Sequence, residues 1–222
     1  MKYNELLELL KSKSDRKFAE FSKTLSNSGY IVIGVKNPDL RAIIKEHTKD
    51  EELKLEDFET GKYLEIDFIY FGLGINRANG NKEKLEFLKN NIHKAKSWAI
   101  TDTASTYLKK ITFAEFWDFF ISLYKGKNTY ERRMAYVLGL KLYKEKEMLQ
   151  VLNLINLKEE YMVMMAEAWL LATLSINFPN DIYNFLSKIN DDTLKRKTIS
   201  KIVESFRIDE GTKSKFKDLR NL

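Results

Sequence analysis

Residues Tyr161 to Asn180 read YMVMMAEAWLLATLSINFPN, and Glu167 is the one charged residue among them. The stretch has the length of a membrane span, which needs about 20 apolar residues. The central Glu167 and the segment Asn177-Phe178-Pro179 argue against a span. A helix that is apolar on every side is also typical of one packed between other helices. The stretch therefore predicts a helix sandwiched between layers of a helical protein.

The composition favours helices along the whole chain of 222 residues. Nine Gly and two Pro make up about 5% of the chain, whereas roughly 12% is usual, and an all-β chain needs many turn residues. Hydrophobic residues are 44% of the total, which is enough to fill a core. Helical periodicity recurs with short polar joints, so we expect an all-α fold of paired helices stacked as a solenoid.

The periodicity places the expected helices at residues 2–12, 14–27, 38–48, 51–59, 62–75, 81–91, 97–110, 112–125, 129–145, 147–156, 159–176, 179–188, 192–206 and 210–220. Tyr30–Val35 is rich in β-branched residues, but a single strand has no partner, so we expect an extended linker there. Asn37 is the expected N-cap of the helix that Pro38 opens.

Other features bear on compartment and organisation. The chain has no Cys, which excludes disulfides, thiolate zinc sites and cysteine nucleophiles, and its two His leave little for a metal cage. The first residues, MKYNELLELLKSKSD, contain no apolar signal core, so we expect a cytoplasmic protein. No Gly-, Ser- or Pro-rich linker interrupts the helices, so we expect a single domain over residues 1–222.

The net charge of +6 is concentrated near the C-terminal end. Residues 194–222 contain nine Lys or Arg and four Asp or Glu, which gives +5. Such a surplus suits phosphate backbones, since each neutralised phosphate releases counterions. The alternative is a solvated face of a Lys-rich protein.

Two helices carry polar side chains that could form a site. Trp98 and Asp102 stand one helical turn apart, off the apolar stripe, and together could hold a cation; equally, Trp98 could pack against a neighbouring helix. Arg133 opens a nearly apolar helix and needs a partner, which could be Asp102, a phosphate or backbone carbonyls. The signatures of NTPases, zinc proteases and serine hydrolases are missing from the sequence.

Four segments in order resemble the AlkD-like DNA alkylation repair family over roughly residues 15 to 210. They are Ile33–Arg41 (IGVKNPDLR), Ser97–Asp102 (SWAITD), Tyr130–Arg133 (YERR), and Met164–Trp169 (MMAEAW) with Lys197–Ile208 (KTISKIVESFRI). The resemblance implies HEAT-like helical-hairpin repeats stacked as a curved α-solenoid whose concave, basic cleft holds duplex DNA. Active members are N-glycosylases that release cationic N3- and N7-alkylated purines, without metal or cofactor.

The resemblance also assigns roles to residues. Asp102 matches the family's catalytic aspartate, Trp98 and Trp169 match its cleft tryptophans, and Arg133 matches its cleft arginine. Basic residues that could contact the DNA backbone are Arg132, Lys195, Arg196, Lys197, Lys201 and Arg207. The segment Lys17–Leu25 departs from the aromatic-Met-basic motif of active members and resembles a shorter branch of the family. The alternative function is a catalytically silent module that binds nucleic acid or another ligand in the same cleft, or a protein-interaction scaffold.

Overall fold

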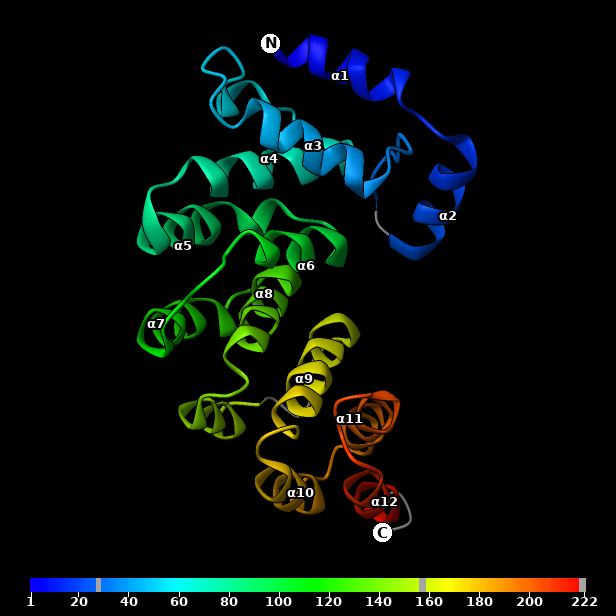
Figure 1. Ribbon diagram of the computed structural model, residues 1–222, viewed down its shortest axis with the longest axis vertical. Helices are drawn as coiled ribbons and strands as arrows, with labels where there is room; N and C mark the ends of the chain where they lie inside the picture. The colour runs from blue at the N-terminus through cyan, green and yellow to red at the C-terminus, as the bar shows by residue number, and fades with distance from the viewer. Residues whose placement is uncertain (27–28, 156–158, 220–222) are drawn as a thin grey trace. The chain divides into compact units, whose positions relative to one another are not determined.

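The computed structural model describes residues 1–26, 29–155 and 159–219. They form two compact units, Met1–Lys110 and Ile111–Leu222, so the prediction of one domain over residues 1–222 stays a prediction. The N-terminal unit (Figure 1) contains α1 (Tyr3–Ser12), α2 (Arg16–Ser26), α3 (Asn37–His47), α4 (Leu64–Arg77), α5 (Gly80–Asn91) and α6 (Trp98–Thr106), with 3-10 turns at Leu55–Asp57 and Ile92–Lys94.

The C-terminal unit is also built from helices. They are α7 (Phe113–Tyr124), α8 (Thr129–Gly139), α9 (Tyr161–Leu174), α10 (Pro179–Lys188), α11 (Asp192–Glu204) and α12 (Glu210–Asp218), with 3-10 segments at Leu140–Leu142 and Lys146–Asn153. In the described part of the chain we find one isolated β-bridge and no strand. The predicted all-α fold is confirmed. The predicted helix ends at residues 27, 156 and 220 lie outside the described residues.

The helix predicted at residues 51–59 is wrong, because only Leu55–Asp57 forms a short 3-10 turn there. The carboxylate of Asp50 accepts a hydrogen bond from the backbone N–H of Glu52 at 3.1 Å. Such local side-chain bonds offer the backbone an alternative to the helical ladder. The predicted helix at 147–156 is likewise a 3-10 segment, Lys146–Asn153.

The start of α3 differs from the prediction by one residue. Lys36 is the N-cap, with extended backbone angles, and its carbonyl accepts hydrogen bonds from the N–H groups of Asp39 and Leu40. Asn37 is therefore the first helical residue, and the predicted Asn cap is wrong. Proline is still tolerated at position 38, because an N–H in the first turn has no partner within the helix.

The predicted extended linker Tyr30–Val35 is confirmed, but it has a partner that the sequence did not reveal. The N–H of Ile31 donates to the carbonyl of Lys62 at 2.9 Å, and the N–H of Leu64 donates to the carbonyl of Ile31 at 3.1 Å. The buried carboxylate of Glu65 accepts the N–H groups of Ile33, Gly34 and Val35 at 3.0, 2.7 and 3.3 Å. These bonds fix the linker that leads into α3.

Gly34, within this linker, lies in the left-handed region, with φ of +97°. A Cβ atom at this position would lie 2.4 Å from the carbonyl oxygen of Asp15. Gly34 also accepts, through its own carbonyl, a hydrogen bond from the N–H of Asp15 at 3.0 Å. The glycine therefore lets the start of α2 approach the linker closely.

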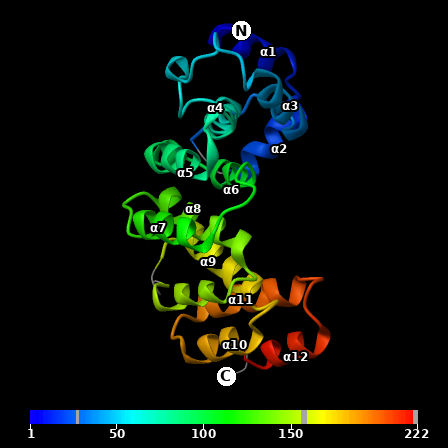
Figure 2. The same ribbon diagram turned by 60° about the vertical axis from the view of Figure 1, so that its left-hand side comes forward.

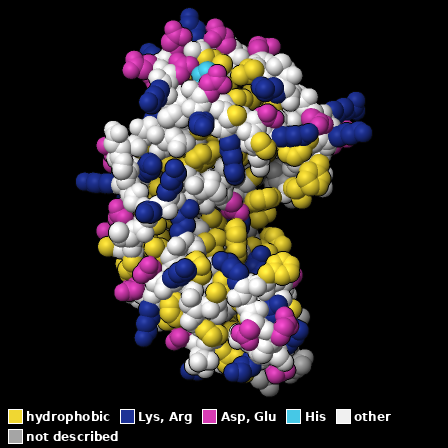
Figure 3. Space-filling view, in the orientation of Figure 1, with side chains coloured by type: hydrophobic (Ala, Val, Ile, Leu, Met, Phe, Trp, Pro, Cys, Tyr) yellow, Lys and Arg dark blue, Asp and Glu magenta, His cyan; other side chains and the backbone are white. Residues whose placement is uncertain are grey.

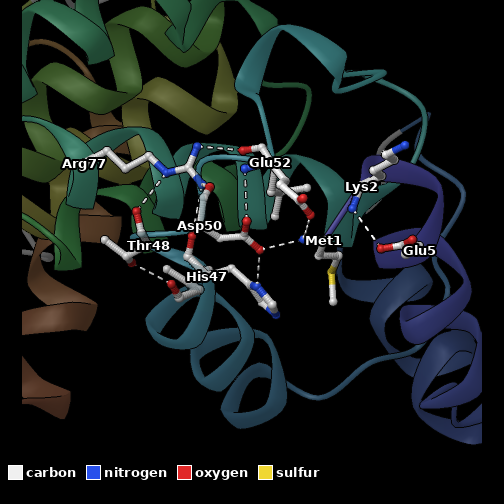
Figure 4. A network of polar contacts seen from close by, with 10 residues as sticks. Met1, Lys2, Glu5, His47, Thr48, Asp50, Glu52 and Arg77 are labelled. Atoms are coloured by element: carbon white, nitrogen blue, oxygen red, sulfur yellow. Dashed lines mark hydrogen bonds and ion pairs between the residues drawn. The ribbon is translucent and has the colours of Figure 1, made fainter.

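Within the N-terminal unit, α4 packs against α3, α5 and α6. Its residues Glu65 to Ile75 are all buried, as expected for a central helix. Arg77, the last residue of α4, reaches back to the end of α3 (Figure 4). Its guanidinium donates to the carbonyls of His47, Thr48, Asp50 and Leu53 at 2.8 to 3.0 Å. The C-terminal end of α3 is thereby attached to α4.

Within the C-terminal unit, α9 packs against α8 on one side and α11 on the other (Figure 1 and Figure 2). Ten of its fourteen residues are buried, Glu167 among them. This confirms the sandwiched helix predicted from the apolar stretch. In the part of the chain that the structure describes, we find no helix with the length and apolar character that crossing a bilayer requires.

Asp67 lies fully buried on α4 and gives the N-terminal unit a testable pH dependence. It accepts hydrogen bonds from the hydroxyl of Tyr30 and from the N–H of Gly61, the latter at 2.8 Å. Burial raises the pKa of Asp67 to about 6, against an ordinary value of 3.8. The folded state therefore holds this proton more tightly than the unfolded chain. The stability that the proton contributes is complete below the unfolded pKa of 3.8 and is lost as the pH rises to the folded pKa of about 6.

We expect the free energy of unfolding of the wild type, relative to that of Asp67→Asn, to fall by about 2 kcal/mol between pH 4.5 and pH 7.5. The amide of the variant does not titrate, so the difference isolates this carboxyl. Urea unfolding at both pH values measures it. A difference that stays constant, or that grows with pH, would contradict the buried and partly protonated carboxyl.

Candidate functional site

The sequence around α6 places Trp98 and Asp102 on successive turns of one helix. Ser97 is the N-cap, and its hydroxyl accepts a hydrogen bond from the N–H of Ala99 at 3.2 Å. The buried side of α6 carries Ile100, Thr101, Ala104 and Ser105. The hydroxyl of Ser105 donates to the carbonyl of Asp102 at 2.7 Å within the helix.

A pocket of about 370 Å³ lies in the N-terminal unit, between α2, α3, α4 and α6. Trp98 and Asp102 both line it, as do apolar side chains from the other three helices. These apolar residues include Phe18, Phe21, Leu25, Leu40, Leu64 and Phe68. The pocket is therefore mostly apolar and aromatic with a carboxylate at its wall, which is usual for a ligand site with few polar groups.

The charged groups of this pocket are Asp102, Arg41 and Glu65. Glu65 is already engaged by the three linker N–H groups described above. Asp102 is half-buried, and its Oδ1 accepts a hydrogen bond from the hydroxyl of Thr101 at 3.0 Å. A positively charged ligand in the pocket would thus meet a carboxylate and an indole ring one turn apart.

Helix α2 supplies a wall of this pocket that sequence reasoning missed. None of its residues from 16 to 25 is fully buried, and Phe21 and Leu25 remain 58% and 51% exposed. The indole Nε1 of Trp98 donates to the carbonyl oxygen of Leu25 at 3.2 Å, across 73 residues of sequence. The apolar positions 18, 21 and 25 share one face of an otherwise polar helix, and this spacing was the available signal.

Arg133 lies in the C-terminal unit, on α8, and is buried. Its Nη1 donates to the backbone carbonyl of Met162 at 2.7 Å. A backbone carbonyl, one of the three partners that the sequence left open, is thus confirmed. Arg132 is engaged by carboxylates of Glu159 and Glu160 at 3.0 and 3.1 Å, so a phosphate would have to compete with both.

Glu167, the isolated charge of the apolar stretch, is fully buried on α9. It interacts with the hydroxyl of Tyr136 on α8. Burial, reinforced by the charge of Glu167 and by this hydrogen bond, holds the pKa of Tyr136 far above its ordinary value. The tyrosine therefore stays protonated, and the pair ties α8 to α9.

Trp169 on α9 and Lys201 on α11 line a second hollow in the C-terminal unit. Trp169 is 38% exposed, and the Nζ of Lys201 lies 5.9 Å from the centre of its ring. Both line a pocket of about 230 Å³ together with Arg207. Lys195 is half-buried, whereas Arg196 and Lys197 are exposed.

The structure therefore brings the predicted site residues together in two groups. Trp98 and Asp102 share a pocket of the N-terminal unit, and Trp169, Lys201 and Arg207 share one of the C-terminal unit. A single cleft that contains both groups stays a prediction. Among the described residues, no three His, Asp or Glu side chains gather in a way that could hold a metal ion.

Comparison with known proteins gives two matches. The model of the family described as DNA alkylation repair enzyme matches residues 6–205. The chain is similar in fold to a solved structure described as a predicted DNA alkylation repair enzyme from Enterococcus faecalis, with a TM-score of 0.70 and 17% sequence identity. That similarity covers 87% of this chain and 98% of the other, and it confirms the all-α, solenoid-like fold.

No protein of curated function matches the sequence. The family match, however, spans all four sequence segments that suggested the resemblance, from Ile33–Arg41 to Lys197–Ile208, apart from the last three residues. It also includes α2 to α11 and both groups of site residues except Arg207. The chain therefore belongs to the DNA alkylation repair enzyme family.

Proposed function

We propose that this DNA alkylation repair protein is an N-glycosylase that releases cationic N3- and N7-alkylated purines from duplex DNA. The observation that carries the proposal is the placement of the Trp98 ring and the Asp102 carboxylate in one largely apolar pocket. A cationic purine is flat, aromatic and positively charged. An indole ring and a carboxylate attract such a base by ring contact and by charge.

The chemistry needs little from the protein, because the alkylated base is already a good leaving group. The bond between the sugar C1′ and the base nitrogen breaks, its electron pair neutralises the base, and the sugar becomes an oxocarbenium ion. The carboxylate of Asp102 stabilises this cation and accepts a proton from the water that attacks C1′. No general acid is required for the departure of a cationic base.

The basic residues of the C-terminal unit would hold the DNA backbone. The proposed contacts are Lys195, Arg196, Lys197, Lys201 and Arg207. Arg132 and the buried Arg133 would bind a phosphate only in competition with the carboxylates of Glu159 and Glu160 and the carbonyl of Met162, respectively. Because each neutralised phosphate releases counterions, binding should weaken steeply as salt rises. Arg196 and Lys197 are exposed on α11 and support this role.

The direct test measures base release by the wild type from duplex DNA methylated at N3 of adenine and N7 of guanine. We expect release of both bases above the spontaneous rate, and no release of the neutral lesion 1,N6-ethenoadenine under the same conditions. The neutral lesion is the matched control, since its departure requires a general acid. Release at the spontaneous rate only would contradict the proposal.

A catalytically silent DNA-binding module is the second candidate, and one observation favours it. Helix α2 lines the Asp102 pocket with Phe21 and Leu25, in the segment whose sequence departs from active members. This candidate predicts salt-sensitive binding of duplex DNA without base release, and binding that Asp102→Asn hardly changes. Binding that does not respond to salt would argue against a phosphate partner altogether.

A further inference from the structure

The side chain of Phe206 is fully exposed, at 103% of its reference area, and is the most exposed large hydrophobic side chain in the described part of the protein. It stands at the turn that follows α11. The turn is held on both sides, because Ile202 and Ile208 are buried in the core. The N–H of Arg207 also donates to the hydroxyl of Ser205 at 3.3 Å. The ring is therefore presented to solvent by an anchored turn.

Two basic side chains, Lys201 and Arg207, lie close to Phe206 in the sequence. Ser205 and Arg207, its two neighbours in sequence, line the same pocket as Trp169 and Lys201. The guanidinium of Arg207 lies 5.3 Å from the centre of the Tyr143 ring, and Lys201 lies over Trp169 as described above. Glu204 is the one acidic residue that lines the pocket. Figure 3 shows hydrophobic and basic side chains next to one another over α9 and α11.

We propose that this surface, formed by Trp169, Lys201, Phe206 and Arg207, binds DNA at a base that is not stacked in the duplex. The Phe206 ring packs against the face of the unstacked base, and Lys201 and Arg207 hold the flanking phosphates. The inference rests on DNA as the substrate of the proposed function and adds a preference for interrupted helices, such as a bulge or a gap.

The chemistry of the side chains leads to this occupant. A phenylalanine ring has no hydrogen-bond donor or acceptor, so it cannot read the edge of a paired base. Its face, in contrast, stacks on any base that leaves the helix, and apolar wedges of this kind interrupt base steps. A polyanion also suits the charge of the adjacent pocket, which is lined by Lys201 and Arg207 and by one acidic residue, Glu204.

The test compares the affinity of the full-length protein for three DNAs of one sequence at a fixed salt concentration. They are a continuous duplex, a duplex with a single-nucleotide bulge and the single strand. We expect the wild type to prefer the bulged duplex. Phe206→Ser should weaken binding to the bulged duplex by roughly 5- to 100-fold and binding to the continuous duplex by less than about twofold. Phe206→Tyr, which keeps the stacking face, should retain the preference.

Ile121→Ser is the matched control. Ile121 is 41% exposed on α7, and this substitution also removes an exposed apolar side chain, but at another place on the protein. Equal affinity of the wild type for bulged and continuous duplexes, or equal losses in Phe206→Ser and Ile121→Ser, would overturn the inference. Base release separates the two proposals. A wild type that releases bases without preferring the bulge overturns this inference alone, and one that prefers the bulge without releasing bases overturns the glycosylase alone.

Discussion

Asp102→Asn should slow the release of N3-methyladenine and N7-methylguanine by about 100- to 10,000-fold, the range that a positioned acid–base side chain contributes. The amide that replaces the carboxylate carries no negative charge, so it does not stabilise the oxocarbenium ion. It also accepts no proton from the attacking water. Both contributions act in a pocket whose lining is largely apolar, where a charge interacts more strongly than in water.

The variant should fold normally, which makes its kinetics interpretable. Asn has the shape of Asp, and its amide oxygen can still accept the hydrogen bond that the Thr101 hydroxyl donates at 3.0 Å. The side chain is only half-buried, so we expect the free energy of unfolding to change by less than about 1 kcal/mol.

Single-turnover release from methylated duplex DNA measures this effect, with duplex affinity followed across salt. Asp118→Asn is the control, since Asp118 is an exposed carboxylate on α7 in the other unit. It removes the same charge and should release bases at the wild-type rate. If Asp102→Asn also kept the wild-type rate, the chemistry would have to reside in another group.

The fold was predictable because helical periodicity is a local property of the sequence. The helix within Tyr161–Asn180 is one example, since an apolar surface on all sides leaves no solvent face. The helix predicted at residues 51–59 is wrong because the Asp50 side chain competes with the helical hydrogen bonds for the backbone N–H groups. The outcome of this competition depends on the conformation of the turn. The hydrogen bonds of Ile31 with Lys62 and Leu64 join residues that are distant in the sequence, so no local pattern predicts them.

The candidate site was predictable only in part, for the same reason. Trp98 and Asp102 are one turn apart, so their common pocket follows from helix geometry. The contribution of α2 depends on the contact between Trp98 and Leu25, which the fold alone brings together. Likewise, the need of Arg133 for a partner was evident from its apolar helix, but the carbonyl of Met162 became identifiable only in three dimensions.

Arg77→Met should destabilise the N-terminal unit by about 3 to 5 kcal/mol, since hydrogen bonds to charged groups each contribute about 1.5 to 3 kcal/mol and are not additive. Arg77 donates to four backbone carbonyls at the end of α3 and in the following turn (Figure 4). Met keeps the length and apolar stem of the side chain but removes every donor. The carbonyls of α3 also lose a cation at the negative end of the helix.

Arg16→Met is the matched control. Arg16 is 92% exposed and pairs with Glu20 one turn along α2, an arrangement that contributes at most about 0.5 kcal/mol. Arg77→Lys should recover less than half of the loss, because a single ammonium group cannot reach carbonyls that a planar guanidinium contacts on several sides. Urea unfolding measures the free energy of unfolding of all three variants. Amide hydrogen exchange then reports the local stability of α3 and α4 in each of them.

The expected consequence extends from stability to the candidate site. Helix α3 contributes Leu40 and Arg41 to the pocket that holds Trp98 and Asp102. A less stable α3 would therefore change the shape of the pocket while Trp98 and Asp102 stay unaltered. Arg77→Met should accordingly weaken binding of the cationic base more than Arg16→Met does. If Arg77→Met unfolded at the same urea concentration as Arg16→Met, the prediction would be wrong. Water would then replace the guanidinium at these carbonyls without loss of stability.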